Sequence, residues 1–376
     1  MKLQRKNRLR ASAFGALAVS GALLLTACGS DNNTGGTGGT GSSAAAKNVK
    51  CEGAKGKLLA AGSSAQKNAM DLWVKNYMAA CQGVEINYKS SSSGEGISNF
   101  TSGVVGFAGS DSALKPEEAT ASKAVCKTGQ GINLPMVGGP IAIGYNLPNV
   151  DNLVLDASAI AKIFNNQIKK WNDPALVKLN PGAKLPDKPI QSVHRSGDSG
   201  TTQNLGKYLG KAAPADWKYE AEKKWPAPGG QGANGSAGVA AQVKQVEGSI
   251  GYFELSYATS QSIPTVKVAT GAAAPVAANS ENASKAIAAA KIKGTGKDLA
   301  LGLDYTTKAE GAYPLVLVTY EIVCDSGNKA DTLPTVKSFL GYTASEEGQK
   351  VLSEAGYAPI PAEINQKVRE TIAGLK

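Results

Sequence analysis

A repeated order of strand, small-residue loop and helix between residues 57 and 111 most strongly limits how this chain can fold. The segments Lys57–Ala61 and Val84–Tyr88 have the apolar or alternating pattern of strands, and each precedes a loop rich in Gly and Ser. Residues 65–80 have helical spacing of their large apolar side chains. This order predicts an α/β fold in which helices cover a parallel sheet.

Three loops are expected to meet at one edge of that sheet. The turn Gly62–Ser64, the loop Ser90–Gly96 and the pair Ser110–Asp111 each follow a predicted strand. Ligands of parallel sheets bind outside the carboxyl ends of the strands. The three loops together therefore predict a polar binding site, whereas each alone would be read as a turn or a helix cap.

The stretch His194–Thr202 combines a guanidinium, small residues and hydroxyls immediately before the helical spacing of residues 203–209. The first amides of a helix lack internal partners and its dipole is positive there, so such a start attracts anions. Arg195 can add a bidentate and permanently charged contact. The stretch predicts an anion site, and an ordinary N-cap on a surface helix is the alternative reading.

The segment Gly197–Gly200 also looks like the nucleophile segment of trypsin-like serine proteases. That mechanism needs a histidine on a separate loop as general base. The chain has 1 histidine, His194, and it lies five positions before Ser199. Catalysis by Ser199 is therefore not expected, and turnover of an activated ester would be needed to revive it.

Residues 1–27 have the composition of a targeting segment, with a basic start and a mostly apolar or small continuation. The ending Leu25–Cys28 resembles a bacterial lipobox, in which the cysteine is lipidated and becomes the mature N-terminus. Ordinary signal cleavage and a transmembrane anchor are the alternatives, although the apolar run is short for a span. Residues 28–50, poor in large apolar side chains, predict a flexible tether. The expected location is extracytoplasmic, on a lipid anchor in the cell membrane.

Charge and cysteine content limit the possible partners. The net charge of the chain is +10, and removal of the basic start leaves about +5, without a dense basic run interleaved with aromatics. Nucleic acid is therefore not an expected partner. Four cysteines remain beside Cys28, an even number that predicts two disulfides in an exported protein, and a metal site is not expected. Three pairings are possible, and position in the chain favours Cys51 with Cys81 and Cys126 with Cys324.

Two apolar strands are expected to connect two domains. Pro135–Tyr145 is a plausible crossing strand, and Pro314–Tyr320 can return the chain to the first domain. The predicted domains are residues 51–136 with 316–376, and residues 137–315. Within the second domain, Lys162–Gly182, which contains Trp171, is expected to be helical.

Several stretches of this chain resemble the phosphate-binding lipoproteins of phosphate-specific ABC transporters. The likeness covers most of residues 57–365, and the segment Ile168–Gly182 is especially distinctive. The other stretches that carry it are Ala61–Ser64, Tyr88–Gly96, Gly106–Asp111, Arg195–Thr201 and Ile250–Ala258.

The resemblance implies a two-domain periplasmic-binding-protein-like clamshell with a hinge of two strands. It implies a monomeric binding protein, without a cofactor or catalytic role, that passes a dehydrated inorganic phosphate to membrane permease subunits. A binding protein for another oxyanion such as sulfate is the alternative. The phosphate-binding positions carried over are Ser64, Ala65, Ser93, Asp111, Arg195, Ser199, Gly200 and Thr201.

Asp111 is the unusual member of this set, because a carboxylate repels an anion unless the ligand carries a proton to donate. Three positions depart from the family pattern. Ser64–Ala65 replaces a Thr followed by an aromatic residue, which keeps a hydroxyl and an amide. Glu95 stands where Gly is commoner and is expected to face solvent. Asp198 lies one position later than the acid of some relatives, which leaves open whether it braces Arg195.

Overall fold

The structure, a computed structural model, describes residues 49–376, which belong to one compact unit. The expected signal peptide, Cys28 and nearly all of the expected tether lie outside these residues. Within residues 49–376, no helix combines the length and the apolar character needed to cross a membrane.

An eight-stranded mixed sheet, in the order β2-β1-β3-β13-β4-β8-β6-β7, forms the centre of the protein. Its strands are β1 (Gly56–Ser63), β2 (Val84–Ser91), β3 (Phe107–Ser110), β4 (Gly131–Tyr145), β6 (Gln191–Arg195), β7 (Gln231–Ala233), β8 (Ser249–Glu254) and β13 (Val316–Cys324). Strands β1 to β3 are parallel to one another, as are β6 to β8. The expectation of a parallel sheet holds within each group and fails in the middle, where β13 and β4 run antiparallel to their neighbours.

Strands β4 and β13 join the two groups. Every residue of both strands is buried, which explains their nearly continuous apolar sequences. Residues 131–140 of β4 pair with β13, and Ile141–Tyr145 then pair with β8. We call residues 49–136 and 316–376 the first lobe and residues 137–315 the second lobe. We call β4 and β13 the shared strands, because β4 crosses from one lobe to the other and Val316–Val318 of β13 pack in the hydrophobic cluster of the second lobe. They are the two strands predicted as the hinge.

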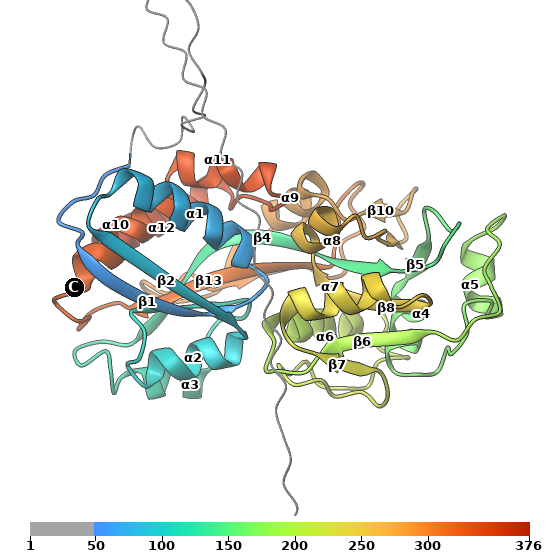
Figure 1. The fold of residues 1–376 in the computed structure, drawn as a ribbon. Helices are drawn as coiled ribbons and strands as arrows, with labels where there is room; N and C mark the ends of the chain where they lie inside the picture. Colours follow the sequence, from blue (N-terminus) through green and yellow to red (C-terminus); the bar gives the residue numbers. More distant parts are fainter. Residues whose placement is uncertain (1–48) are drawn as a thin grey trace, which may run out of the picture. The chain divides into compact units, whose positions relative to one another are not determined.

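Helices cover both lobes (Figure 1). The first lobe contains α1 (Lys67–Ala80), α2 (Ser93–Thr101), α3 (Pro116–Ser122), α10 (Leu333–Thr343), α11 (Glu346–Glu354) and α12 (Ala362–Ala373). The second lobe contains α4 (Ala157–Phe164), α5 (Pro174–Leu179), α6 (Gly200–Ala212), α7 (Gly235–Gln245), α8 (Leu255–Gln261) and α9 (Ser280–Ala288). Two small sheets are formed by β5 (Val154–Asp156), β9 (Lys267–Ala269) and β10 (Val276–Ala277), and by β11 (Lys291–Ile292) and β12 (Leu301–Gly302).

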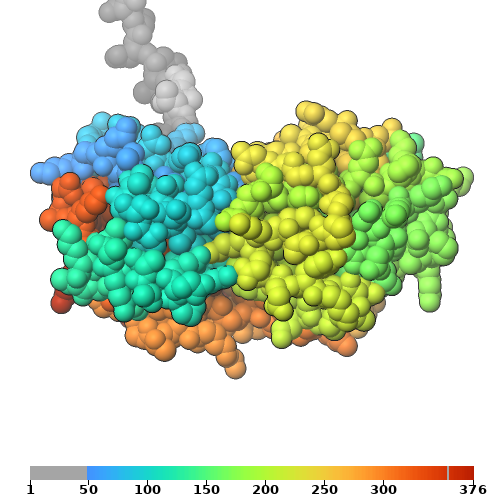
Figure 2. Space-filling model, turned by 90° about the horizontal axis from the view of Figure 1, so that it is seen from below, coloured from blue at the N-terminus to red at the C-terminus, as the bar shows by residue number. Residues whose placement is uncertain are grey.

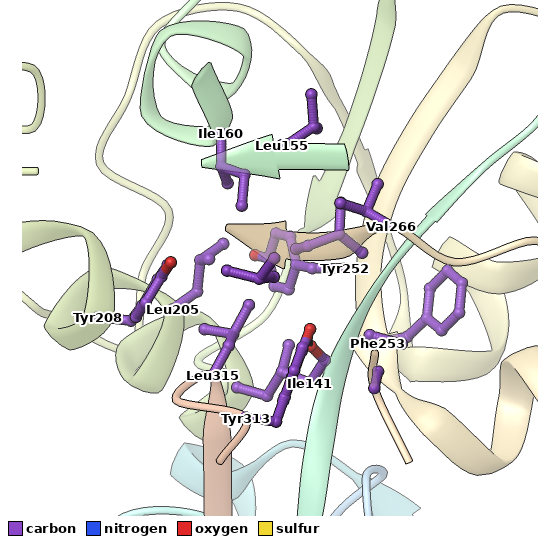
Figure 3. Packing of buried hydrophobic residues seen from close by; sticks show 14 of the residues in the cluster. Ile141, Leu155, Ile160, Leu205, Tyr208, Tyr252, Phe253, Val266, Tyr313 and Leu315 are labelled. Atoms are coloured by element: carbon purple, nitrogen blue, oxygen red, sulfur yellow. Dashed lines mark hydrogen bonds between the residues drawn. The ribbon is translucent and has the colours of Figure 1, made fainter. Parts of the chain in front are cut away.

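Each lobe has its own large hydrophobic cluster. In the first lobe, Trp73 and Tyr77 of α1 are buried, and the Tyr77 ring lies 5.2 Å from that of Phe339. In the second lobe, side chains from several helices and strands gather around Tyr252 and Ile141, as Figure 3 shows. Two large apolar cores are typical of a two-domain protein, and residues of β13 also pack in the core of the second lobe.

The prediction of one helix over Lys162–Gly182 was wrong. Helix α4 ends at Phe164, and Asn166 follows with a φ of +63°. Asp173 then caps a separate short helix, α5. Trp171 lies between them, fully buried, and its indole N–H donates to the Gly248 carbonyl at 2.9 Å. The buried tryptophan is held by a tertiary contact and not by a helix face.

Two of the predicted loops are shorter than expected. Strand β1 continues through Ser63, so Gly62 is within the strand, with a φ of +143°. A Cβ atom at Gly62 would lie 2.0 Å from the Gly109 carbonyl oxygen, so only glycine allows the neighbouring β3 to approach. Helix α2 starts at Ser93, capped by the Ser92 side chain, within the segment predicted as a loop.

Both predicted disulfides are present. Cys51 is bonded to Cys81 at the end of α1, and Cys126 is bonded to Cys324 at the end of β13. The second bond closes a sequence separation of 198 residues. It ties the segment before the shared strand β4 to the end of the shared strand β13.

Candidate functional site

The ends of β1, β2, β3 and β6 bring the predicted polar residues together. Ser64 follows β1, Ser93 starts α2 after β2, and Asp111 follows β3. From the second lobe, Arg195 ends β6 and Ser199–Thr201 begins α6. All of these residues are buried. The convergence predicted from the loops is therefore present, and it includes the segment around Arg195.

The hydroxyl of Ser93 is oriented by two backbone amides. Its Oγ accepts the N–H of Asp111 at 3.1 Å and the N–H of Gly200 at 3.2 Å. Both lone pairs of a serine hydroxyl are then occupied, and only its proton remains for a further hydrogen bond. Ser93 is thus set to act as a donor. The Gly200 bond also joins the first lobe to the second.

Asp111 accepts hydrogen bonds from three hydroxyl groups. Its Oδ1 accepts from Ser63 and, at 2.9 Å, from Thr319, and its Oδ2 accepts from Thr201 at 3.1 Å. Burial raises the pKa of the Asp111 carboxyl, and the hydroxyl donors and the charge of Arg195 oppose that rise. Asp111 is a buried acceptor in a site whose other members are mostly donors.

Arg195 is a buried cation with few good partners. Only 2% of the residue is exposed. Its Nη1 lies 3.5 Å from Ser236 Oγ, its Nη2 lies 3.4 Å from the Ser91 carbonyl oxygen, and its Nε has no partner. Burial lowers the pKa of Arg195, although Tyr252 and Asp111 favour its charged form. A buried charge with unused donors is costly unless an anion satisfies it.

The segment Ser63–Ala65 is held from the second lobe. Ser64 Oγ accepts the N–H of Ser236 at 2.9 Å, and the Ser64 carbonyl accepts the Tyr257 hydroxyl at 2.7 Å. The Ala65 N–H, expected to face a ligand, donates here to Ser63 Oγ at 3.0 Å. This first-lobe segment is therefore in direct contact with α7 and α8.

Ser199 acts as the N-cap of α6 in this structure. Its Oγ accepts the Thr202 N–H at 3.2 Å, so its hydroxyl proton remains available. The ring of His194 stacks on Trp225 at 4.7 Å, and its Nδ1 lies 3.0 Å from the Arg195 carbonyl oxygen. Over residues 49–376 no hydrogen bond joins His194 to Ser199. The serine-hydrolase arrangement is therefore absent from the described residues.

The charged neighbours Asp198 and Glu95 do not contact Arg195. The Asp198 carbonyl accepts the Gly94 N–H at 2.9 Å. Within the described part of the chain, the Asp198 carboxylate forms no ion pair with the guanidinium. Glu95 pairs with Lys89 at 2.7 Å, and 44% of its side chain is exposed. The prediction that Glu95 faces solvent is confirmed.

Three further polar residues belong to this site and were not predicted from the sequence. Ser63 and Thr319 donate to Asp111, and Ser236 contacts both Ser64 and Arg195. Ser236 follows a glycine at the start of α7, the same signal that identified the other helix starts. Thr319 lies within the apolar strand β13 and carries no such signal.

Ion pairs also join the lobes near the surface. Lys115 pairs with Glu222 at 2.8 Å, and Lys223 pairs with Glu118 at 2.5 Å. The Lys223 side chain is only 9% exposed. Figure 2 shows the first lobe, in blue to teal, in contact with the yellow-green second lobe along this face. The lobes are in contact both inside the site and at its rim.

Sequence comparisons place this chain in a known superfamily. The sequence pattern of the PBP superfamily domain matches residues 38–347. The chain is 42% identical to phosphate-binding protein PstS 3 of Mycobacterium tuberculosis over 375 residues, which covers 99% of each protein. It is 34% identical to phosphate-binding protein PstS of Xylella fastidiosa over 318 residues, covering 83% of this chain and 84% of the relative.

Solved structures share the fold. The high affinity periplasmic phosphate-binding protein PfluDING, solved with bound phosphate, has a TM-score of 0.70 at 20% identity, covering 84% of this chain and 93% of that one. A putative phosphate ABC transporter substrate-binding protein from Clostridium perfringens has a TM-score of 0.60 at 20% identity, covering 81% and 100%. At these identities the likeness shows the two-domain fold.

The contact between the lobes at Gly200 leads to a first prediction. A Cβ atom at Gly200 would lie 2.6 Å from Ser93 Oγ and 2.7 Å from Asp111 Cβ, whereas one at Gly210 in the same helix would meet nothing within 4 Å. We expect Gly200→Ala to lower the free energy of unfolding by about 1–3 kcal/mol through overpacking. We expect Gly210→Ala to raise it by up to about 1 kcal/mol through helix propensity. Urea unfolding measures both, and equal changes would contradict the close contact.

Proposed function

The chain belongs to the PBP superfamily and, within it, to the PstS phosphate-binding proteins, and from that premise we propose that its buried site binds inorganic phosphate. The protein binds phosphate outside the cytoplasm and delivers it to an ABC permease for import. It is a transport protein and not an enzyme. The observation that carries the proposal is Arg195, a buried cation whose Nε has no partner and whose neighbours are oriented hydroxyl donors.

The proposed ligand set fits an anion with several oxygen acceptors. The hydroxyl protons of Ser93 and Ser199 have no protein acceptor in the hydrogen bonds described above, and the Ser64 hydroxyl has only a 3.4 Å contact with Ser236 Oγ. Together with Arg195 they can donate to phosphate oxygens without supplying a full counter-charge. The amides of Ala65 and Gly200, which here donate to Ser63 and Ser93, would exchange these acceptors for phosphate. The amide of Thr201 lies beside them at the start of α6.

Asp111 would then select for a ligand that carries a proton. Phosphate keeps at least one proton near neutral pH and can donate it to the carboxylate, whereas sulfate has none. The three hydroxyls on Asp111 stabilise its anionic form and oppose the burial that raises the pKa of the carboxyl. An unprotonated oxyanion would face this carboxylate without a hydrogen bond between them, so Asp111 favours phosphate over sulfate.

We also propose the finer organisation of the chain. Residues 1–27 act as a lipoprotein signal peptide, Cys28 carries the lipid, and residues 28–50 tether the binding domains to the membrane. The composition of these residues supports this assignment. We propose domain boundaries at residues 136–137 and 315–316; the two large hydrophobic clusters support a division into two domains. The protein acts as a monomer, because one chain supplies both sides of the site.

Substitution of the arginine tests the proposed anion contact. Arg195→Lys keeps the charge, but an ammonium cannot form the two parallel bonds of a guanidinium. We expect phosphate binding to weaken by about 1.5–3 kcal/mol, the contribution of a hydrogen bond to a charged group. Isothermal titration calorimetry measures the change. Arg369→Lys in α12 is the matched control and should bind as the parent does, and unchanged affinity of the Arg195→Lys variant would place Arg195 outside the binding contact.

Substitution of the aspartate tests selectivity. Asp111→Asn keeps the shape and removes the charge, and its NH₂ group can turn toward the anion. A site built around a hydrogen-bonding partner rejects an analogue lacking it by roughly 10⁴–10⁵-fold in comparable cases. We therefore expect the variant to lose discrimination against sulfate more than it loses phosphate affinity. Competition binding of the two anions measures this, and sulfate excluded as firmly as by the parent would contradict the selectivity role.

Removal of the lipidation site tests the anchor. Cys28→Ala should release the protein from the membrane fraction without changing phosphate affinity, because the tether separates the anchor from the site. Fractionation of cells followed by binding measurements checks both outcomes. Ser30→Ala serves as the control that stays with the membrane. Membrane retention of the Cys28→Ala variant would refute lipidation at this cysteine.

A further inference from the structure

Two buried carboxyl groups lie close to the site, and the ligand set described above does not use them. Glu254 at the end of β8 and Glu321 on β13 have no exposed surface. Neither forms an ion pair with a Lys or Arg among residues 49–376. Arg195 is the buried cation whose charge acts on the Asp111 carboxyl. The region thus holds three buried acids for a single buried guanidinium.

Glu321 lies on a strand shared by the two lobes and has no hydrogen-bond partner. It pairs in register with Gly109 of β3 and Leu134 of β4. Neither of its carboxylate oxygens accepts a hydrogen bond. The pKa of Glu321 is raised to about 8, chiefly by burial and also by the charge of Asp111, whereas the nearby Gln66 amide opposes the rise without reaching hydrogen-bond geometry. The other titratable group facing it is Tyr88 of β2.

Glu254 is connected to the segment that follows β1. Its Oε2 accepts the N–H of Ser256 at 2.9 Å and the Ser256 hydroxyl, while its Oε1 has no partner. The Tyr357 hydroxyl lies 3.1 Å from Ser256 Oγ and donates to the Ala65 carbonyl at 2.7 Å. Burial raises the pKa of Glu254 to about 8, opposed by the Ser256 donors and reinforced by Asp111. Tyr257 and Tyr357 are the other titratable groups facing it.

The charge balance of the closed site requires these two acids to be neutral. Phosphate brings a charge of about −1.5 to −2 near neutral pH. With Asp111 ionised, the guanidinium of Arg195 already faces more negative charge than it can neutralise. Two further carboxylates without counter-ions would be very costly in a dry interior. A neutral carboxylic acid at each position removes that repulsion.

We propose that Glu254 and Glu321 carry protons that are coupled to ligand binding: both acids take up protons when the site binds phosphate. This inference rests on the proposed phosphate-binding function. The direction of the effect follows from the sign of the charges. An anion nearby favours the protonated acids, so binding draws protons from solution where the acids are partly ionised. As the pH rises through about 8, more of each acid must be protonated on binding and the affinity falls.

Calorimetry of phosphate binding in buffers of different ionisation enthalpy tests the proposal. Four proteins are compared: the full-length parent, the variants Glu321→Gln and Glu254→Gln, and the control Glu95→Gln, whose side chain faces solvent. Glutamine has the shape of the neutral glutamic acid and cannot ionise. At pH 8 we expect the parent and the control to take up on the order of one proton per phosphate and each of the two buried-site variants to take up less. Above that pH, the parent dissociation constant should rise by up to about tenfold per pH unit for each linked proton, and less steeply in the variants.

Free phosphate also changes its protonation in this pH range. That contribution to the measured proton uptake is the same for every protein at a given pH, so a difference between proteins reports the two acids. A buried-site variant with the proton uptake and pH slope of the parent would overturn the proposal, as would zero uptake by the parent at pH 8. If one of the two variants fails to fold, the comparison of the other variant with the parent still decides. Absence of phosphate binding by both the parent and the Glu95→Gln control at neutral pH would instead refute the proposed function.

Discussion

The burial of one guanidinium governs the arrangement of this protein. Arg195 is removed from water at the end of β6, and the partners it has are two long contacts to Ser236 and Ser91. Its charge is tolerable because Asp111 lies nearby and because the surrounding hydroxyls leave room for an anion. The residues that supply these contacts come from both lobes. A ligand that satisfies Arg195 therefore also holds the lobes together.

The shared strands make that coupling possible. β4 and β13 are buried along their whole length and lie in the middle of the sheet, so a displacement of one lobe must be accommodated at them. They also position polar groups: Thr319 of β13 reaches Asp111, and Glu321 lies two residues further on. Apolar strands that hold a core together thus also carry side chains that tune the charge of the site.

Close backbone approach is the second requirement of the site. Glycine is needed at Gly62, where β1 meets β3, and at Gly200, where α6 meets Ser93 and Asp111. Any side chain at these two positions would separate elements that must touch for the donors to converge. The donors are rigid because their lone pairs are already occupied by backbone amides, as at Ser93.

Local sequence patterns predicted most of the central strands and the loops of the site, but not the break between α4 and α5. Small polar loops after strands predicted where Ser64, Ser93, Asp111 and the Arg195 segment converge, the family resemblance singled out these residues, and cysteine positions predicted both disulfides. The tertiary structure alone decided the position of Trp171, the antiparallel centre of the sheet and the roles of Thr319, Glu254 and Glu321. These features depend on contacts between residues far apart in the sequence, such as Thr319 and Asp111, which are separated by 208 residues. The periodicity of apolar residues indicates helices and strands, but it carries no information about which buried polar side chains will meet.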